Sequence, residues 1–577
     1  MYKPPLAKVL IGLAIVTALI TIQYCDVIPV HIKFQLRRFA TGTNATQCRF
    51  TLFRSLLDCI PGRTVTVSDV DIINVTQTVL RSPMSTISRN ILERYAEYRS
   101  IQRLDDFKQL HDSRFSVVEL EGNQDNFTAG AVIKVRISLF NGYNQPITRG
   151  EDLLNIWLRN DAGTSSVAGY VVDHMNGTYT GHVMAFWAGN VTIKVTVTNT
   201  KEGIGLYTNY VHEHGSYKFV NATFSEKRRL EMTQCAPKPS KWLEKTYGGL
   251  CNLTKENYNI SLFCGKPKYA SCSKWVKYGW DDTLYYGKDT KKILQYKDVL
   301  LKKIKLTIYP SLKGDIDYPV PKTACKFLPP YSTWNSTVPS GFLYKGVYTN
   351  LLCRSTVTTS RGEYRACLKH RPLISIGDST TRQWFLHLVD ILAIRKSSRI
   401  PSHAAFHKFA IAENKTLGLH LEWQPHELPF YGSPGSNRRE IKSVAYRIDQ
   451  IPENSSAIVV IHWYAHIARC CDHMTFREHV RKAKEAVLRL LMRSQEVQVF
   501  IKGPHLITYP NALKPYAYIG MFVEQILLEE FYNLTYRVIY LDQWDMSVAM
   551  ENVDIHPNKL LDEISLNNLI NLACNNI

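Results

Sequence analysis

Residues 373–385 have the sequence LISIGDSTTRQWF, from which we predict the fold and the chemistry of the C-terminal part of the chain. The stretch indicates a short buried strand, a tight Gly-Asp turn and a helix whose apolar positions continue to Leu392. Ser379 would lie at the strand-to-helix junction, where the first backbone N–H groups of the helix point toward an incoming oxyanion. That position suits a serine nucleophile in acyl transfer. Because Gly-Asp-Ser is more often an ordinary turn and N-cap, the hypothesis depends on the rest of the chain.

The composition indicates a globular protein with a basic surface. At 577 residues, with 45% hydrophobic and 21% charged residues, the chain can form two or more domains with large cores. Its formal net charge is +20, with a run of lysines between Lys288 and Lys305. Such a surface attracts nucleic acid, anionic lipid or acidic glycan, and a solvated basic face is the alternative interpretation.

The N-terminal sequence predicts a membrane anchor. Lys3 and Lys8 precede an apolar run from Val9 to Ile22, and no small-x-small cleavage site follows it. We therefore expect residues 1–28 to be a cytosolic tail and an uncleaved signal anchor, with the rest of the chain in the lumen.

Sequons and cysteines agree with the secretory pathway. The chain has 13 cysteines and twelve Asn-x-Ser/Thr sites, at Asn44, Asn74, Asn126, Asn176, Asn190, Asn221, Asn252, Asn259, Asn335, Asn414, Asn454 and Asn533. This density is typical of a glycoprotein with disulfides formed in an oxidising lumen, although the pairing does not follow from the sequence. In that compartment we exclude nucleic acid as a partner, and acidic glycan remains.

Hydrophobic periodicity changes along the N-terminal half. Residues 29–110 have mixed charge and short helical patterns, and we interpret them as a stem. Over residues 111–234 apolar and polar residues alternate, as in Ile133 to Leu139 and Val191 to Val197. This alternation predicts an antiparallel β-sandwich of immunoglobulin-like kind, an all-β module. Residues 235–324 form a cysteine-rich and basic connector.

The C-terminal part alternates strands and helices. This pattern predicts that residues 325–577 form a three-layer α/β domain with a mostly parallel sheet. Ser379 would follow the carboxyl end of a strand, where sheets of this kind place their active sites.

Two groups of motifs carry a family resemblance. In the predicted sandwich they are Gly150-Glu151-Asp152, Asp173, Asn176-Gly177-Thr178-Tyr179, Phe186-Trp187-Ala188-Gly189 and Glu202-Gly203. Ahead of the Gly-Asp-Ser strand they are Pro339-Ser340-Gly341-Phe342, Lys345-Gly346-Val347-Tyr348, Cys353 and Cys367-Leu368-Lys369. Both groups resemble the neurexophilin and PC-esterase domain family. The resemblance implies a neurexophilin-type sandwich, which in neurexophilins binds proteins, followed by a PC-esterase domain of the GDSL/SGNH class.

The stretch from residue 551 to 557, ENVDIHP, supplies a candidate base for Ser379. A serine nucleophile needs a base within hydrogen-bond reach and usually an acid that orients the base. We assign these roles to His556 and Asp554. The resemblance supports the assignment, because members of the GDSL/SGNH class pair an early Gly-Asp-Ser with a late Asp-x-x-His.

The chain departs from the class pattern in two places. Val553 stands three residues before His556, so the alternatives to Asp554 are Asp545, Asp542 or no acid. After the strand that ends at Ile461, the family has Gly-Gln-His, and this chain matches only the histidine, at His466. Because a missing oxyanion donor typically costs ~10²–10³ in rate, a weakened or lost activity is an alternative.

Further predicted site residues surround Ser379. We assign oxyanion or substrate binding to Gly377, Asp378, Arg382, Gln383 and His466, with turn, capping or surface roles as alternatives. A zinc site is a competing interpretation of the histidines and cysteines at His462, His466, Cys470, Cys471 and His473. Adjacent cysteines in the lumen favour a disulfide, and we predict no metal.

These patterns together predict a single-pass type II membrane glycoprotein. We place it in the Golgi membrane, with secretion or cell-surface exposure as the alternative. The resemblance implies a glycan O-acetyltransferase or esterase in which Ser379 accepts an acetyl group and passes it to a sugar hydroxyl or to water. Its partners would be a glycan or glycoprotein acceptor, acidic on grounds of charge alone, and an acyl donor such as acetyl-CoA, with no other cofactor. The competing hypothesis is a catalytically silent glycoprotein whose sandwich binds a cell-surface protein.

Overall fold

The structure is a computed structural model. It describes residues 95–574 except 102–103, 123–125, 281–298, 336, 358–359, 395–399, 401–407, 429–435, 441, 468–470 and 508–515. The predicted signal anchor and most of the predicted stem lie outside the described residues. Within the described part, no helix combines the length and the apolar character needed to span a bilayer.

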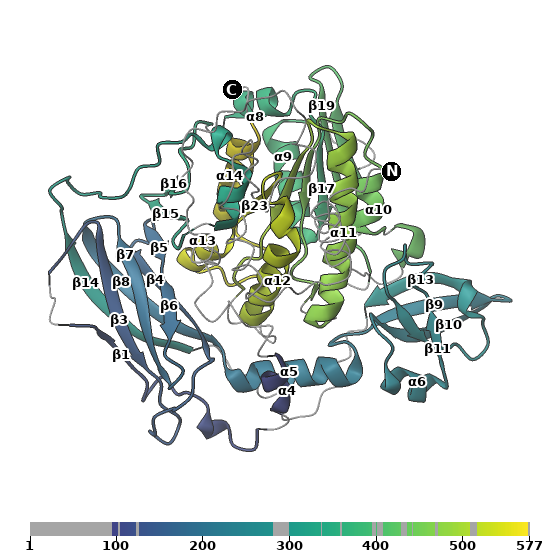
Figure 1. Cartoon of the computed structure of the whole chain (residues 1–577), viewed down its shortest axis with the longest axis horizontal. Helices are drawn as coiled ribbons and strands as arrows, with labels where there is room; N and C mark the ends of the chain where they lie inside the picture. The colour runs from purple at the N-terminus through teal and green to yellow at the C-terminus, as the bar shows by residue number, and fades with distance from the viewer. Residues whose placement is uncertain are drawn as a thin grey trace, which may run out of the picture. The chain divides into compact units, whose positions relative to one another are not determined.

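Two sheets pack face to face in the N-terminal part (Figure 1). The first has the order β1-β3-β7-β6, with bounds Val117–Leu120, Ala131–Ser138, Thr178–Ala185 and Tyr170–Asp173. The second has the order β16-β15-β5-β4-β8-β14-β2, with bounds Val347–Asn350, Gly341–Tyr344, Ser166–Ala168, Leu153–Asn160, Gly189–Asn199, Val299–Tyr309 and Phe127–Thr128. The predicted alternation places Ile133, Val135 and Ile193 in one shared core. That the sandwich is of neurexophilin type stays a prediction.

A third sheet contains the cysteine-rich segment. Its order is β11-β12-β10-β9-β13-β20, with bounds Leu250–Asn252, Phe263–Gly265, Arg229–Ala236, Val220–Glu226, Trp275–Trp280 and Ser436–Asn437. Disulfides Cys235–Cys264 and Cys251–Cys272 lie within this region. The helix α6, Lys241–Tyr247, packs beside it.

The sheets cross the predicted domain boundaries at residues 234 and 324. Strand β9 and most of β10 lie inside the predicted sandwich range, but both pair in the third sheet. Strands β14 to β16 come from later segments and pair in the sandwich. The physical reason is that alternation reports a half-buried strand without specifying the strand with which it pairs.

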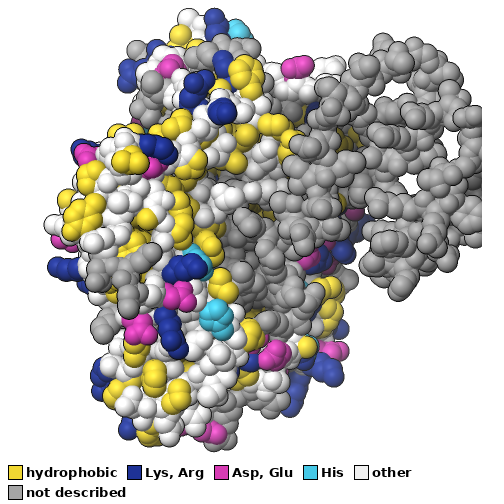
Figure 2. Space-filling model, turned by 60° about the vertical axis from the view of Figure 1, so that its left-hand side comes forward, with side chains coloured by type: hydrophobic (Ala, Val, Ile, Leu, Met, Phe, Trp, Pro, Cys, Tyr) yellow, Lys and Arg dark blue, Asp and Glu magenta, His cyan; other side chains and the backbone are white. Residues whose placement is uncertain are grey.

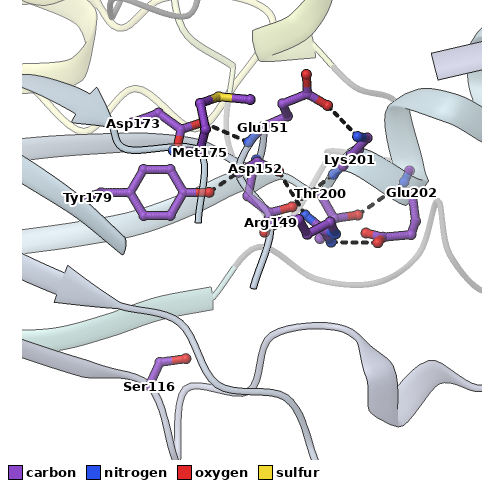
Figure 3. A network of polar contacts seen from close by, with 12 residues as sticks. Ser116, Arg149, Glu151, Asp152, Asp173, Met175, Tyr179, Thr200, Lys201 and Glu202 are labelled. Atoms are coloured by element: carbon purple, nitrogen blue, oxygen red, sulfur yellow. Dashed lines mark hydrogen bonds and ion pairs between the residues drawn. The ribbon is translucent and has the colours of Figure 1, made fainter. Parts of the chain in front are cut away.

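Several sandwich motif residues meet in one polar network (Figure 3). The backbone N–H of Glu151 donates to Asp173 Oδ2 at 2.7 Å, and the N–H of Asp152 donates to the Tyr179 hydroxyl at 3.3 Å. A Cβ atom on Gly150 would lie 2.5 Å from the carboxylate oxygens of Asp173. The glycine is therefore required by the close approach of two chain segments.

The same network joins the sandwich to α5, Lys201–His214, the helix that connects β8 to β9. Asp152 Oδ1 accepts from the backbone N–H of Lys201 at 2.8 Å. Arg149 pairs with Asp152 at 3.1 Å and with Glu202 at 2.5 Å. The Lys201 side chain pairs with Glu151 at 2.6 Å. These contacts give the motif residues a structural role at the start of α5.

The C-terminal domain has three layers around a sheet of order β18-β19-β17-β21-β22-β23. The strand bounds are Ala410–Asn414, Leu419–Pro425, Leu373–Gly377, Ile458–Ile461, Gln498–Lys502 and Val538–Leu541. All neighbours in this sheet are parallel except the β18–β19 pair. The predicted mixed α/β architecture is confirmed.

Helices cover both faces of this sheet. Alternate strand residues face opposite sides and therefore pack against different helices. Ile374 and Ile376 pack with α10 (Val444–Asp449), α11 (His473–Arg493) and α12 (Tyr516–Phe531). Leu373 packs on the other side with α8 (Arg361–Leu368), α9 (Ser379–Ile391) and α14 (Lys559–Ala573). Disulfides Cys325–Cys353 and Cys367–Cys574 lie on this second side.

The remaining helices are short. An α-helix, α4, spans Tyr95–Ser100 and packs on α5, and α13 spans Trp544–Ala549. The 3₁₀ turns span Phe107–Gln109, Cys272–Lys274, Cys325–Phe327, Pro330–Asn335, Arg438–Glu440 and Tyr532–Leu534.

Candidate active site

The predicted nucleophile and the predicted base lie in hydrogen-bond contact. Ser379 is the first residue of α9 and is half-buried at the carboxyl end of β17. Its Oγ lies 2.7 Å from His556 Nε2, although the two residues are 177 positions apart in sequence. In the neutral ring with its proton on Nδ1, Nε2 accepts from the hydroxyl and can take its proton.

Asp378 is a buried anchor for the nucleophile turn. Its Oδ1 accepts from the backbone N–H of Thr380 at 2.9 Å and from the Thr380 hydroxyl at 2.7 Å. Its Oδ2 lies 3.4 Å from His462 Nε2, and Lys502 Nζ donates to the Thr380 hydroxyl at 2.7 Å. Burial alone would raise the pKa of Asp378, but His462, His466 and Lys502 outweigh it and hold the pKa well below its usual range.

Gly377 allows two strands to come close beneath this turn. It is the buried last residue of β17, and its carbonyl accepts from the His426 N–H at 3.2 Å. A Cβ atom at this position would lie 2.8 Å from Thr381 Oγ1 and 3.0 Å from the His462 carbonyl oxygen. These contacts explain the glycine by packing, and its oxyanion role stays a prediction.

His466 forms a pair with a histidine that the sequence analysis missed. His466 Nδ1 lies 2.9 Å from His426 Nε2, and His426 Nδ1 lies 3.2 Å from the Glu427 carbonyl oxygen. Burial lowers the pKa of His426 to about 4, so its ring is neutral at neutral pH. Since the carbonyl can only accept, His426 donates through Nδ1 and accepts from His466 Nδ1–H. His426 directly follows β19, and a histidine after a strand end was the available signal.

Arg382 and Gln383 occupy the first turn of α9 in different ways. Arg382 is only 8% exposed, and its guanidinium carbon lies 5.8 Å from the ring centroid of Trp423. Gln383 Nε2 donates to the carbonyl oxygen of Pro557 at 3.3 Å. Gln383 therefore contacts the segment that carries His556. Whether either residue binds substrate stays a prediction.

Two further residues hold the same segment and were not predicted. His505 Nε2 donates to the carbonyl oxygen of Ile555 at 2.9 Å, and burial lowers the pKa of His505 to about 3. Asn552 is buried, and its Nδ2 donates to the carbonyl oxygens of Leu506 and Asp554 at 2.7 and 2.8 Å. The carbonyl groups of the two residues before His556 are thus held by side-chain donors.

No described carboxylate contacts His556. The Asp554 side chain is exposed, and the described residues give it no hydrogen bond or ion pair with the ring. Asp545 Oδ1 accepts from the Ser340 hydroxyl at 2.8 Å, and Asp542 Oδ1 accepts from the N–H of Trp544 at 2.9 Å. The described contacts form a Ser–His pair, and the orienting role of Asp554 stays a prediction.

The zinc alternative gains no support from the described part of the chain. There, no three His, Cys, Asp or Glu side chains gather as metal ligands do. Cys470, one of the residues considered for such a site, lies outside the described residues.

One known protein family is similar to the domain that holds this site. Residues 348–574 match the family model described as "NXPE family member 4-like, C-terminal domain". The C-terminal part of the chain is thus similar to the NXPE family. The match includes Ser379 and His556 and covers less than half of the chain, so the neurexophilin half of the resemblance stays a prediction.

One solved structure is an active-site mutant of a family two carbohydrate esterase from Clostridium thermocellum. It is 8% identical to this chain, and the alignment covers 76% of this chain and 93% of that one with a TM-score of 0.17. At this TM-score the alignment assigns neither a fold nor a function to this chain.

Proposed function

We propose that the chain is a serine-dependent O-acyltransferase or esterase that acts on carbohydrate hydroxyls. The observation that carries the proposal is the 2.7 Å contact between Ser379 Oγ and His556 Nε2 at the N-terminus of α9. The neighbouring Asp378 does not replace His556 as the partner of the Ser379 hydroxyl, because its carboxylate accepts hydrogen bonds from the backbone N–H and the hydroxyl of Thr380. The NXPE-like match of this domain agrees with an acyl-ester chemistry.

The proposed reaction has two transfers. His556 Nε2 takes the Ser379 proton as Oγ bonds to the acyl carbon of the donor. The leaving group departs with the proton from His556, and an acyl-serine remains. A sugar hydroxyl or water, deprotonated by His556, then attacks the acyl carbon and releases Ser379 Oγ, which regains the proton. We assign stabilisation of the oxyanion to the N-terminus of α9 and to His466.

The acidic character of the acceptor rests on the net charge of +20 alone. On the face that Figure 2 shows, Lys and Arg side chains are scattered among hydrophobic and acidic ones and do not gather in one patch. We therefore propose a carbohydrate hydroxyl as the acceptor and assign no particular sugar.

The test uses the full-length glycosylated protein with a chromogenic acetyl ester, with and without a sugar acceptor. Hydrolysis or transfer should fall by about 10³-fold or more in Ser379→Ala and in His556→Ala. His387→Gln, on α9 but away from the Ser379 contact, is the matched control and should keep the wild-type rate. Wild-type rates in Ser379→Ala would contradict the proposal and favour the binding-protein hypothesis.

A further inference from the structure

Three sandwich side chains converge on Glu551, five residues before the candidate base. Trp157 Nε1 donates to Glu551 Oε1 at 2.8 Å, and Lys194 Nζ reaches the same oxygen at 2.5 Å. Arg159 pairs with the other carboxylate oxygen, Oε2. Trp157 and Arg159 belong to β4 and Lys194 to β8, so both donor strands are neighbours in the sandwich sheet.

The neighbouring side chains keep the Glu551 carboxylate ionised and fix its position. Its side chain is 26% exposed, and those of Arg159 and Lys194 are 27% and 20% exposed. Burial acts to raise the pKa of Glu551, but the bonds from Lys194 and Trp157 and the charge of Arg159 lower it below its ordinary value. A carboxylate with three donors in a partly buried site is better fixed than an exposed ion pair.

The backbone of Glu551 is also in an unusual conformation. Its φ of 54° is in the left-handed region, which a non-glycine residue rarely adopts unless its surroundings hold it there. Its N–H donates to the Val548 carbonyl at 3.0 Å, at the end of α13. The side-chain contacts with the sandwich thus hold a tight change of direction immediately before the segment that carries His556.

Further contacts hold the segment between Glu551 and His556. The Asn552 N–H donates to the Ser547 carbonyl at 2.9 Å, and the Asn552 side chain fixes Asp554 and Leu506 as described above. His505 then fixes the Ile555 carbonyl. A displacement of Glu551 would be passed to His556 over the four residues between them, which have no regular secondary structure of their own.

We propose that the sandwich is a positioning module for the candidate base. Trp157, Arg159 and Lys194 hold Glu551, and through residues 552–555 they set the distance between His556 and Ser379. The proposal rests on the proposed function. It assigns the sandwich to the catalytic unit itself, in addition to any partner that its outer surface binds.

The test compares Glu551→Gln and Glu551→Leu with Asp317→Asn in the full-length glycosylated protein. Asp317 pairs with Lys313, whose side chain is 74% exposed. This control therefore removes one carboxylate charge from a residue that is distant from Glu551 in sequence and shares no partner with it. Arg159→Lys, which keeps a cation beside Glu551, is the conservative variant. Thermal unfolding shows which variants are folded. If Glu551→Leu does not fold, the test rests on Glu551→Gln.

Two readouts separate the two proposals. Amide hydrogen exchange of residues 552–556 reports how firmly the segment is held and does not require the protein to be active. The kcat and KM for an acetyl ester report how well His556 acts as the base. We expect exchange to rise at least tenfold and kcat to fall at least tenfold in the Glu551 variants, with KM unchanged. Asp317→Asn should match wild type, and Arg159→Lys should lie between.

Unchanged exchange in folded Glu551 variants would overturn the inference, and so would faster exchange with an unchanged kcat. If wild type has no esterase activity, the proposed function fails and with it the role in catalysis. The exchange data would then still show whether the sandwich holds residues 552–556.

Discussion

Gly377 ends β17 and lies close to the first residue after β21 and to the first turn of α9. A methyl group there would meet Thr381 Oγ1 at 2.8 Å and the His462 backbone oxygen at 3.0 Å. Because the backbone of a buried strand end cannot move cheaply, we expect Gly377→Ala to destabilise the domain by about 1–3 kcal/mol. Gly362→Ala in α8 has open space around its Cβ and should be neutral or stabilising. Equal unfolding temperatures of the two variants would contradict this account of Gly377.

Asp554 distinguishes a Ser–His pair from a triad. Its side chain is exposed and, among the described residues, makes no contact with His556. We therefore expect Asp554→Asn to change kcat/KM for an acetyl ester by no more than about threefold, whereas removal of an orienting acid costs on the order of 10⁴ in kcat. A loss of that size would restore Asp554 to the role that the sequence suggested.

Asp562 on α14 makes stability depend on pH. Burial raises the pKa of Asp562 to about 7, and the charge of Lys502 only partly opposes it. In the unfolded chain the pKa is about 4, so between about pH 4 and about pH 7 the folded state binds more protons. The contribution of Asp562 is thus fully present at low pH and is lost as pH rises through about 7.

Unfolding measurements over this range check the sign. Stability of wild type relative to Asp562→Asn should fall as pH rises, with a slope of at most about 1.4 kcal/mol per pH unit. Parallel pH curves for the two proteins would show that Asp562 does not titrate in this way.

At the scale of elements, the segment between α13 and α14 depends on donors from neighbouring loops. His505, after β22, donates Nε2–H to the Ile555 carbonyl at 2.9 Å. We expect His505→Phe to lower the labelling rate of Ser379 by an active-site probe at least tenfold, since the carbonyl beside His556 loses its donor. His505→Gln carries an amide donor on a side chain of similar reach and should retain most of the rate. Equal losses in both variants would indicate a packing role.

The elements around the site could be predicted because their signals are local. The strand from Leu373 and the helix from Ser379 follow from apolar runs and a Gly-Asp turn, and both lie where the pattern put them. His426 and His505 could not be assigned roles in advance, because each gains its partner only in the folded chain. The partner of His426 is His466, which follows β21, and the partner of His505 is the Ile555 carbonyl, which follows α13. Which sheet β9, β10 and β14 would join is likewise a tertiary choice that alternation does not encode.

At the scale of the whole molecule, the described sandwich and the α/β domain share apolar core. Trp157 and Ala168 of the sandwich belong to the same buried cluster as Trp544 and residues of α12. The sandwich therefore cannot be treated as an appended binding module, which is how the sequence motifs alone present it. None of the ten described sequon asparagines is buried, which agrees with the expected glycosylation.

The most direct test of the account is labelling of the full-length glycosylated protein with a fluorophosphonate probe. An activated serine predicts labelling of wild type at Ser379, none in Ser379→Ala and a rate lowered by about 10²-fold or more in His556→Ala. A folded wild-type protein that neither reacts with the probe nor hydrolyses an acetyl ester would contradict the claim that the Ser379–His556 contact is a working catalytic pair.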